Sequence, residues 1–212
     1  MKKYLALLPL ALAVYLAPLQ AQDYKMAAGP VPPPADLPAA YRALLSQGVQ
    51  IDGPSGPKAQ VWFAKSIASG AAPSDPAVVF GIAQGTFLGI IRFPGKSEDR
   101  RGQALNAGTY TLRYSNFPND GAHQGVAPQR DFALLTPIAN DADPAATPAF
   151  DALVQMSTKA SNSPHPAVLS LEPSSATSYP SLTKEGDNPD WVLNVQAGSL
   201  KIGIILIGKY QG

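Results

Sequence analysis

Most of this chain divides into short runs of β-branched, aromatic and aliphatic residues, each bounded by Pro, Gly, Asn or Asp. In the clearest run, TYTLRYS at residues 109–115, the side chains of Tyr110, Leu112 and Tyr114 alternate with polar ones. Such alternation places the two sets on opposite faces of a strand, and a strand with one apolar and one wet face is typical of an antiparallel sheet. Similar runs occupy residues 59–65, 86–93, 131–137, 167–173, 190–196 and 200–208, and residues 77–82 are predicted to form another.

Two other segments have helical signals. Asp36 is placed to cap a short helix whose apolar residues, beginning with Leu37 and Tyr41, share one face. A second helix is expected at about residues 148–160, because a Thr-Pro start precedes apolar residues at helical spacing. The pattern therefore predicts a mostly β protein, a single two-layer antiparallel β-sandwich with jelly-roll-like connections and two short helices, over residues 36–212.

The first 21 residues have the features of a cleaved secretory signal peptide. Lys2 and Lys3 precede an apolar run at residues 4–19, and Ala21 is a small residue at a suitable cleavage position. The run is short, contains Pro and is followed by polar sequence, which favours a signal peptide over the alternative, an uncleaved membrane anchor. We therefore expect a secreted or periplasmic protein with no stable membrane insertion after cleavage.

A Pro-rich linker is predicted at residues 22–35, QDYKMAAGPVPPPA. Three consecutive prolines favour an extended polyproline II conformation, because each ring fixes φ and removes an amide donor. The composition suits a tether that holds the folded domain away from its point of export, with recognition of the Pro-rich run by a partner as the alternative.

Charge and cysteine content exclude several classes of function. Loss of residues 1–21 removes Lys2 and Lys3 from 16 basic residues and none of the 15 acidic ones, which leaves a net charge of −1. A near-neutral surface is unlike that of nucleic-acid-binding proteins. The chain has no cysteine, so thiolate metal sites and disulfides are excluded and stability must come from apolar burial.

No short catalytic motif is present: there is no G-x-S-x-G, no H-E-x-x-H, no phosphate-binding Gly-rich loop and no EF-hand loop. The chain has two histidines. His123 lies three residues after Asp120, and His165 lies between two prolines just before a predicted strand. If the loops converge, His123, His165 and Asp120 can hold Zn²⁺ or Cu²⁺. The alternative is that these are ordinary loop residues and that the protein has no cofactor.

Two arginines and two tryptophans are candidate ligand-binding residues. Arg92 and Arg113 lie within apolar strands, where a guanidinium can clamp an anion or carboxylate; alternatively, both heads reach solvent while their stems cover the sheet. Trp62 and Trp191 can stack on a sugar ring if exposed, although both lie in strand patterns that favour core packing.

Several segments resemble a group of secreted bacterial β-sandwich proteins with no established activity. The segments are LGIIRFPGKSEDRRGQALNAGTYTLRY, DGAHQGVAPQRDFALL, HPAVLSL and the C-terminal pair DWVLNV and GSLKIGIILIGK. The likeness covers roughly residues 58–210 and centres on an AGTYTLRY-type strand. It implies export, a β-rich fold and a shared pattern that includes both histidine segments, and it transfers no catalytic residue.

The sequence thus favours an exported, non-enzymatic binding or structural module of the periplasm or cell envelope with an unknown ligand. The alternatives are a metal-binding protein or metal-dependent enzyme using the two histidines, and a carbohydrate-binding module.

Overall fold

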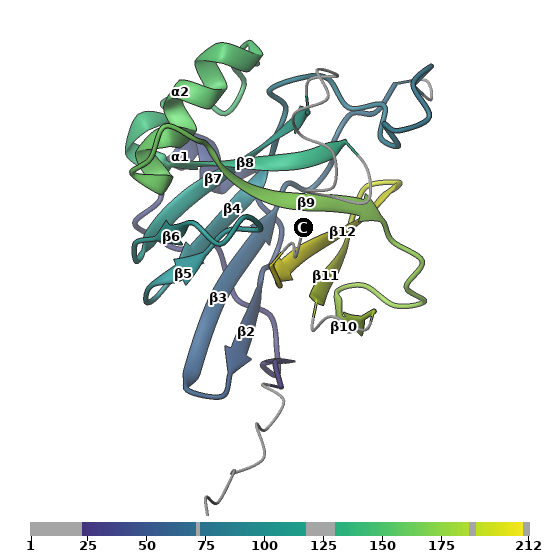
Figure 1. Cartoon of the computed structure of the whole chain (residues 1–212). Helices are drawn as coiled ribbons and strands as arrows, with labels where there is room; N and C mark the ends of the chain where they lie inside the picture. Colours follow the sequence, from purple (N-terminus) through teal and green to yellow (C-terminus); the bar gives the residue numbers. More distant parts are fainter. Residues whose placement is uncertain (1–22, 71–72, 118–129, 187–189, 210–212) are drawn as a thin grey trace, which may run out of the picture.

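A computed structural model describes residues 23–70, 73–117, 130–186 and 190–209. Ten strands form one antiparallel sheet in the order β1-β2-β3-β4-β7-β8-β9-β12-β11-β10, and β5 pairs with β6 separately (Figure 1). The mostly β, antiparallel fold with two short helices is confirmed. The elements are β1 (Lys25–Met26), α1 (Ala39–Leu44), β2 (Val49–Gly53), β3 (Gly56–Phe63), β4 (Phe87–Phe93), β5 (Ser97–Glu98), β6 (Ala104–Leu105), β7 (Gly108–Asn116), β8 (Asp131–Pro137), η1 (Ile138–Asn140), α2 (Phe150–Ser161), β9 (Ala167–Pro173), β10 (Ser181–Glu185), β11 (Asp190–Ala197) and β12 (Leu200–Ile207).

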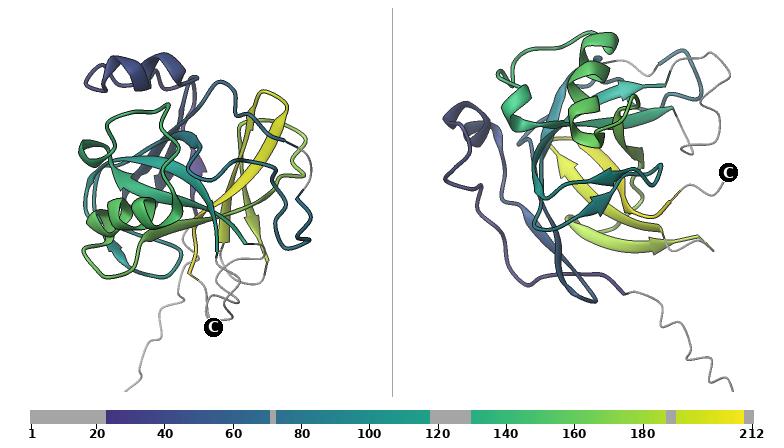
Figure 2. Two further views of the ribbon diagram at one scale, coloured as in Figure 1. Left: turned by 90° about the horizontal axis from the view of Figure 1, so that it is seen from above. Right: turned by 60° about the vertical axis from the view of Figure 1, so that its left-hand side comes forward.

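The two layers are opposite walls of one sheet that curls until it nearly closes on itself. The curl passes through β9, whose first residues, 167–170, pair with β8 and whose last residues, 171–173, pair with β12. The edge strands β1 and β10 then come into contact. Figure 2 shows the curl from above and from the side, with both helices on its outer surface.

The connections combine a meander with one Greek key. Strands β10, β11 and β12 are consecutive antiparallel neighbours, and β9 lies beside β12 although residues 174–180 carry the chain to the far edge first. This is the Greek key pattern, and it is the jelly-roll-like part of the architecture. Gly198, with φ +65°, forms the tight turn between β11 and β12, as hairpins of this kind require.

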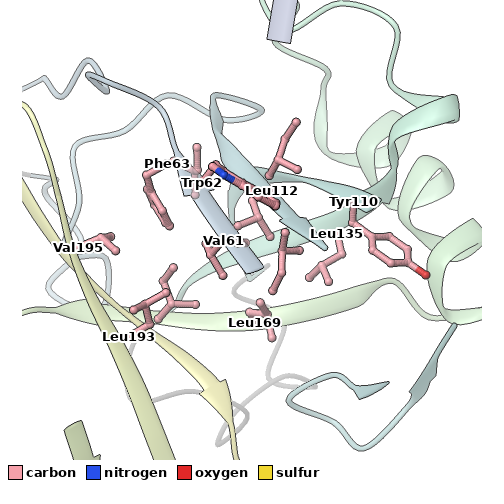
Figure 3. Close-up of a cluster of buried hydrophobic side chains, with 14 of the residues drawn as sticks. Val61, Trp62, Phe63, Tyr110, Leu112, Leu135, Leu169, Leu193 and Val195 are labelled. Atoms are coloured by element: carbon pink, nitrogen blue, oxygen red, sulfur yellow. The ribbon is translucent and has the colours of Figure 1, made fainter. Parts of the chain in front are cut away.

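The interior of the curl is an apolar core supplied by both walls. Alternation along each strand sends every second side chain inward, as predicted for Tyr110 and Leu112. Because chain from both walls surrounds this space, the core side chains are almost completely buried. Figure 3 shows the cluster, which includes Val61, Phe63, Tyr110, Leu112, Leu135, Leu169, Leu193 and Val195.

The outer face of β7 is not wet, contrary to the expectation for residues 109–115. Thr111, Arg113 and Ser115 are buried there. Arg113 bonds to the chain at residues 141–146, and Tyr41 of α1 reaches the same segment. A second covering layer therefore lies outside the sheet. Alternation predicted the two faces correctly, but it carries no information about what covers the polar one.

Residues 77–82 do not form the predicted strand. The backbone amides of Val79 and Phe80 donate to the buried Asp131 carboxylate at 2.8 and 3.2 Å instead of to a neighbouring strand. The first helix begins at Ala39, and no side chain caps it. The expected cap is wrong because Asp36 accepts hydrogen bonds from Arg92. Within the described residues, no helix combines the length and apolar character needed to cross a bilayer.

The segment expected to be a spacer packs on the domain in its described part, residues 23–35. Strand β1 pairs with β2, and Val31 forms an antiparallel bridge with Gly48. The indole nitrogen of Trp62 donates to the carbonyls of Val31 and Pro32 at 3.0 and 3.1 Å. Prolines lack an amide donor but keep their carbonyl acceptor, so a Pro-rich run can still satisfy a buried indole.

Candidate functional site

The two edge strands of the sheet, β1 and β10, face each other along a line that we call the seam. The seam is closed at one end and open at the other. At the closed end, the ring of Tyr24 meets Trp191 edge-on with 5.6 Å between ring centroids. At the open end, a groove of about 360 Å³ separates β2 and β3 from β11 and from the two residues just before β10. We call it the seam groove; its lining residues are Ser46, Gln47, Gly48, Val49, Val61, Phe63, Tyr179, Pro180, Val195, Gln196 and Gly198. Its volume falls in the range of about 300–1,000 Å³ typical of small-molecule sites.

The floor of the seam groove is aliphatic and aromatic. Val49, Val61, Phe63 and Val195 are each at most 9% exposed, and Figure 3 shows Val61 and Phe63 on one wall with Val195 on the other. The floor is thus the outermost layer of the apolar core, reached through the gap where the sheet stops pairing. A ligand that covers it removes apolar surface from water.

The rim carries uncharged hydrogen-bonding groups. Ser46 Oγ donates to the Phe63 carbonyl at 3.0 Å, and Gln196 Nε2 donates to the Gly198 carbonyl at 3.0 Å. These bonds orient both side chains, while the hydroxyl oxygen of Ser46 and the amide oxygen of Gln196 are acceptors. Gln47 is exposed. The described lining is therefore apolar below and polar but uncharged above.

Two features shape the rim of the seam groove: close backbone packing at Gly48, and a tyrosine, Tyr179, whose position is fixed by its own contacts. A Cβ atom on Gly48 would lie 2.4 Å from the Trp62 ring, so only glycine allows the chain this close. The Tyr179 hydroxyl accepts from Ser174 Oγ and donates to the Ser174 carbonyl, and the Lys201 ammonium lies 5.5 Å from the ring centroid. These contacts hold the tyrosine at the rim.

A second groove of about 310 Å³ lies beside the first, at the end of α1. Lys65 supplies its charged group and Leu44, 43% exposed, is its most exposed large apolar side chain. We call it the helix groove; its lining residues are Ala43, Leu44, Ala64, Lys65, Ser66, Thr86, Phe87 and residues 144–147.

Two of the three predicted metal ligands fall outside the part of the chain that the structure describes. His123 and Asp120 lie outside the described residues. His165 is exposed, and its backbone bonds to Ser163 in the turn before β9. Across the described ranges, no three His, Cys, Asp or Glu side chains gather as metal ligands would. A Zn²⁺ or Cu²⁺ site involving His123 stays a prediction.

Arg113 clamps a carboxylate, but one that belongs to the chain itself. Its side chain is fully buried and bonds Asp141 through Nε and Nη2 at 2.6 and 2.7 Å. The remaining donors reach the carbonyls of Gly85, Asp143 and Ala146. The alternative in which the head reaches solvent is therefore wrong for Arg113. All five guanidinium donors are used within the chain. Arg113 therefore fastens residues 141–146 to β7 and is not a site for an external anion.

Arg92 pairs with Asp36 near the surface. Its Nη2 donates to both carboxylate oxygens at 2.9 and 2.8 Å, and its Nε donates to Thr109 Oγ1 at 2.9 Å. The Asp36 side chain is 70% exposed. This pair ties the segment before α1 to β4 and uses Nε and Nη2 of the guanidinium within the chain.

Neither tryptophan forms an exposed platform. Trp62 is fully buried and bonds to the segment before α1, and Trp191 is 9% exposed at the closed end of the seam. Core packing, the alternative favoured by the strand patterns, is confirmed for both. The chain's own residues cover both rings, so the carbohydrate-binding alternative stays a prediction without these two tryptophans as its platform.

Glu172 is an unusual carboxyl group on the outer face of β9. Burial, followed by the nearby carboxylates of Glu185 and Asp190, raises the pKa of Glu172 to about 7, and Arg100 acts in the opposite direction. A raised pKa means that the folded protein holds a proton that the unfolded chain releases above its ordinary value of 4.5. Stability from this group is therefore present below pH 4.5 and is lost as the pH rises through 7.

We predict that Glu172→Gln stabilises the protein at pH 8 and has little effect at pH 4.5. After a discount for partial exposure, the gain at pH 8 is about 1–2 kcal/mol, and denaturant unfolding at both pH values measures it. Glu98→Gln is the matched control, because Glu98 is half exposed and pairs with Lys209 at the surface. A variant of Glu172 that keeps the wild-type slope of stability against pH would refute this assignment.

Comparison with protein-family models, with curated proteins and with solved structures found no match. The fold and site together define a curled antiparallel sheet with an uncharged groove at its open seam.

Proposed function

We propose that this chain is an exported, non-enzymatic binding module of the periplasm or cell envelope, and that its ligand occupies the seam groove. Export rests on the features of residues 1–21 described above. The observation that carries the binding role is the groove itself, where an apolar floor of the core meets an uncharged polar rim at the place where the sheet fails to close.

The lining favours a small neutral ligand with one apolar face. Val61, Phe63 and Val195 offer contact area, and Ser46 and Gln196 offer hydrogen bonds from positions fixed by their own backbone partners. Side chains already held in place lose little conformational entropy on binding. An apolar pocket with a few oriented polar groups is the usual composition of a small-molecule site.

We predict that Gln196→Trp blocks this site. Gln196 is exposed at the rim, so a large ring there fills the groove without entering the core. A library of small neutral fragments, screened by ligand-observed NMR against the wild-type protein, should yield binders whose affinity falls at least about ten-fold in the variant. Thermal unfolding of both proteins checks that the fold is retained.

Gln155→Trp is the matched control, because Gln155 is exposed on α2, outside the lining of either groove. It should leave fragment binding unchanged. Fragments that bind equally well to the wild type and to Gln196→Trp would show that the seam groove is not the site, and a screen without any binder would count against the proposal as a whole.

A further inference from the structure

The seam groove and the helix groove lie on either side of one short ladder. Leu45 and Ala64 form an isolated antiparallel bridge. The Ser46 amide donates to the Phe63 carbonyl and the Lys65 amide donates to the Leu44 carbonyl, each at 2.8 Å. Ser46 and Phe63 line the first groove, whereas Leu44 and Lys65 line the second. Only the width of this ladder separates the two sites.

The grooves also meet at the surface. Ser66, in the lining of the helix groove, lies against the β11–β12 turn, where a Cβ on Gly198 would be 3.7 Å from the Ser66 Cβ. Gly198 lines the seam groove, and both residues are exposed. A ligand longer than one groove can therefore continue into the other across Ser66 and Gly198.

The backbone around this junction is already paired. The amides of Ser46, Gly48, Ala64 and Lys65 all donate to carbonyls of neighbouring segments. An extended peptide that binds by adding a strand needs unpaired backbone groups, and these amides do not supply them. Side-chain hydroxyls and amides above apolar surface are available instead, and they suit a chain of hydroxyl-bearing rings with apolar faces.

Among the described residues that line the seam groove and the helix groove, Lys65 is the one with a charged side chain. Its ammonium donates to the Ala43 carbonyl at the end of α1 at 2.8 Å, and the side chain is exposed. An ammonium has three donors, so two remain for a ligand. The anchoring bond keeps the positive charge at the helix groove, where it favours an anionic group.

We propose that the two grooves bind successive units of one acidic oligosaccharide, with a neutral sugar in the seam groove and a carboxylate beside Lys65. This inference rests on the proposed function, because it assumes that the seam groove is a ligand site. It adds the length of the ligand, its chemical class and the position of its charge.

The test uses an array of neutral trisaccharides and the same trisaccharides ending in a single uronic acid, followed by calorimetric titration of those that bind. The wild-type protein should prefer the uronate form by about five-fold, the size expected for one exposed ion pair. That preference should shrink in about 0.5 M salt, because exposed charges are screened. In Lys65→Met, the ratio of the two affinities should fall to about one.

Lys159→Met is the matched control, since Lys159 is exposed on α2, and it should keep the wild-type ratio. A preference that is absent, or that survives Lys65→Met, overturns the acidic oligosaccharide. If neutral and acidic sugars bind with equal affinity and Gln196→Trp abolishes that binding, the seam groove stands as the site and the extension into the helix groove is rejected. An array without any binder, beside fragments that do bind the seam groove, rejects the sugar class alone.

Discussion

Asp141→Asn is expected to lower the free energy of unfolding by about 3–5 kcal/mol, the cost of leaving a buried charge without its partner. The Arg113 guanidinium is fully buried, and Asp141 is the carboxylate that neutralises it. Thr111 Oγ1 also donates to this carboxylate at 2.6 Å, and the Tyr41 hydroxyl donates to the Asp141 carbonyl at 2.9 Å. Denaturant unfolding at pH 7 measures the loss.

The pH dependence of this loss has a defined sign. Burial alone would raise the pKa of Asp141, but hydrogen bonds from Arg113 and Thr111 outweigh it and hold the pKa below its ordinary value of 3.8. A lowered pKa gives stability that is present above 3.8 and is lost as the pH falls. The wild type and Asp141→Asn should therefore converge in acid.

Two further variants make the interpretation specific. Asp36→Asn breaks the exposed pair with Arg92 and should cost far less than Asp141→Asn, because solvent screens an exposed ion pair. The double variant Arg113→Met/Asp141→Leu should recover part of the loss seen in Asp141→Asn, because apolar replacement of both partners leaves no unpaired charge. A cost for Asp141→Asn no larger than that for Asp36→Asn would contradict the claim that the buried Arg113–Asp141 pair stabilises the fold.

The strand pattern was predictable because it depends on local alternation. The runs at residues 131–137 and 167–173 coincide with β8 and β9. Strands β2 and β10 were missed because each has only five residues, VQIDG and SLTKE, and SLTKE contains a single apolar residue. Residues 77–82 have a strand composition, but a side chain, Asp131, takes the place of a partner strand.

The candidate site was not predictable from the same pattern. The seam groove joins residues 46–49 to residues 195–198, and no local spacing indicates that these segments meet when the sheet curls. These two stretches supply serine, glutamine, valine and glycine to the lining, and such residues have no motif of their own. Gly48 and Gly198 are the available signals, but the sequence pattern does not reveal that Gly48 is a point of close backbone packing against Trp62.

The same limit applies to Arg113. Its position in an apolar strand suggested a guanidinium that clamps a ligand's anionic group or one that reaches solvent, whereas the guanidinium binds the chain's own Asp141. The partner, however, is 28 residues away, in a segment whose path over the sheet is set by tertiary packing. An internal clamp and an external one look alike in sequence, and only the covering layer distinguishes them.

Asp131→Ala is expected to destabilise the protein by about 2–4 kcal/mol, because it leaves several buried groups without an acceptor. Asp131 is fully buried and accepts from the amides of Val79 and Phe80 and from the Tyr114 hydroxyl. These bonds fasten residues 77–82 to the sheet and bury Phe80 in the core. Denaturant unfolding gives the overall cost, and hydrogen exchange at Val79 and Phe80 should accelerate by at least about ten-fold.

Asp75→Ala separates this role from a general effect of losing a carboxylate in the same loop. Asp75 accepts from the Ala77 amide at 2.9 Å and pairs with Arg130, but its side chain is 36% exposed, so its loss should cost less than about 1 kcal/mol. It should also leave the Val79 and Phe80 amides protected, since their acceptor remains. Unchanged protection of those two amides in Asp131→Ala would mean that core packing of Phe80, not the carboxylate, holds the segment in place.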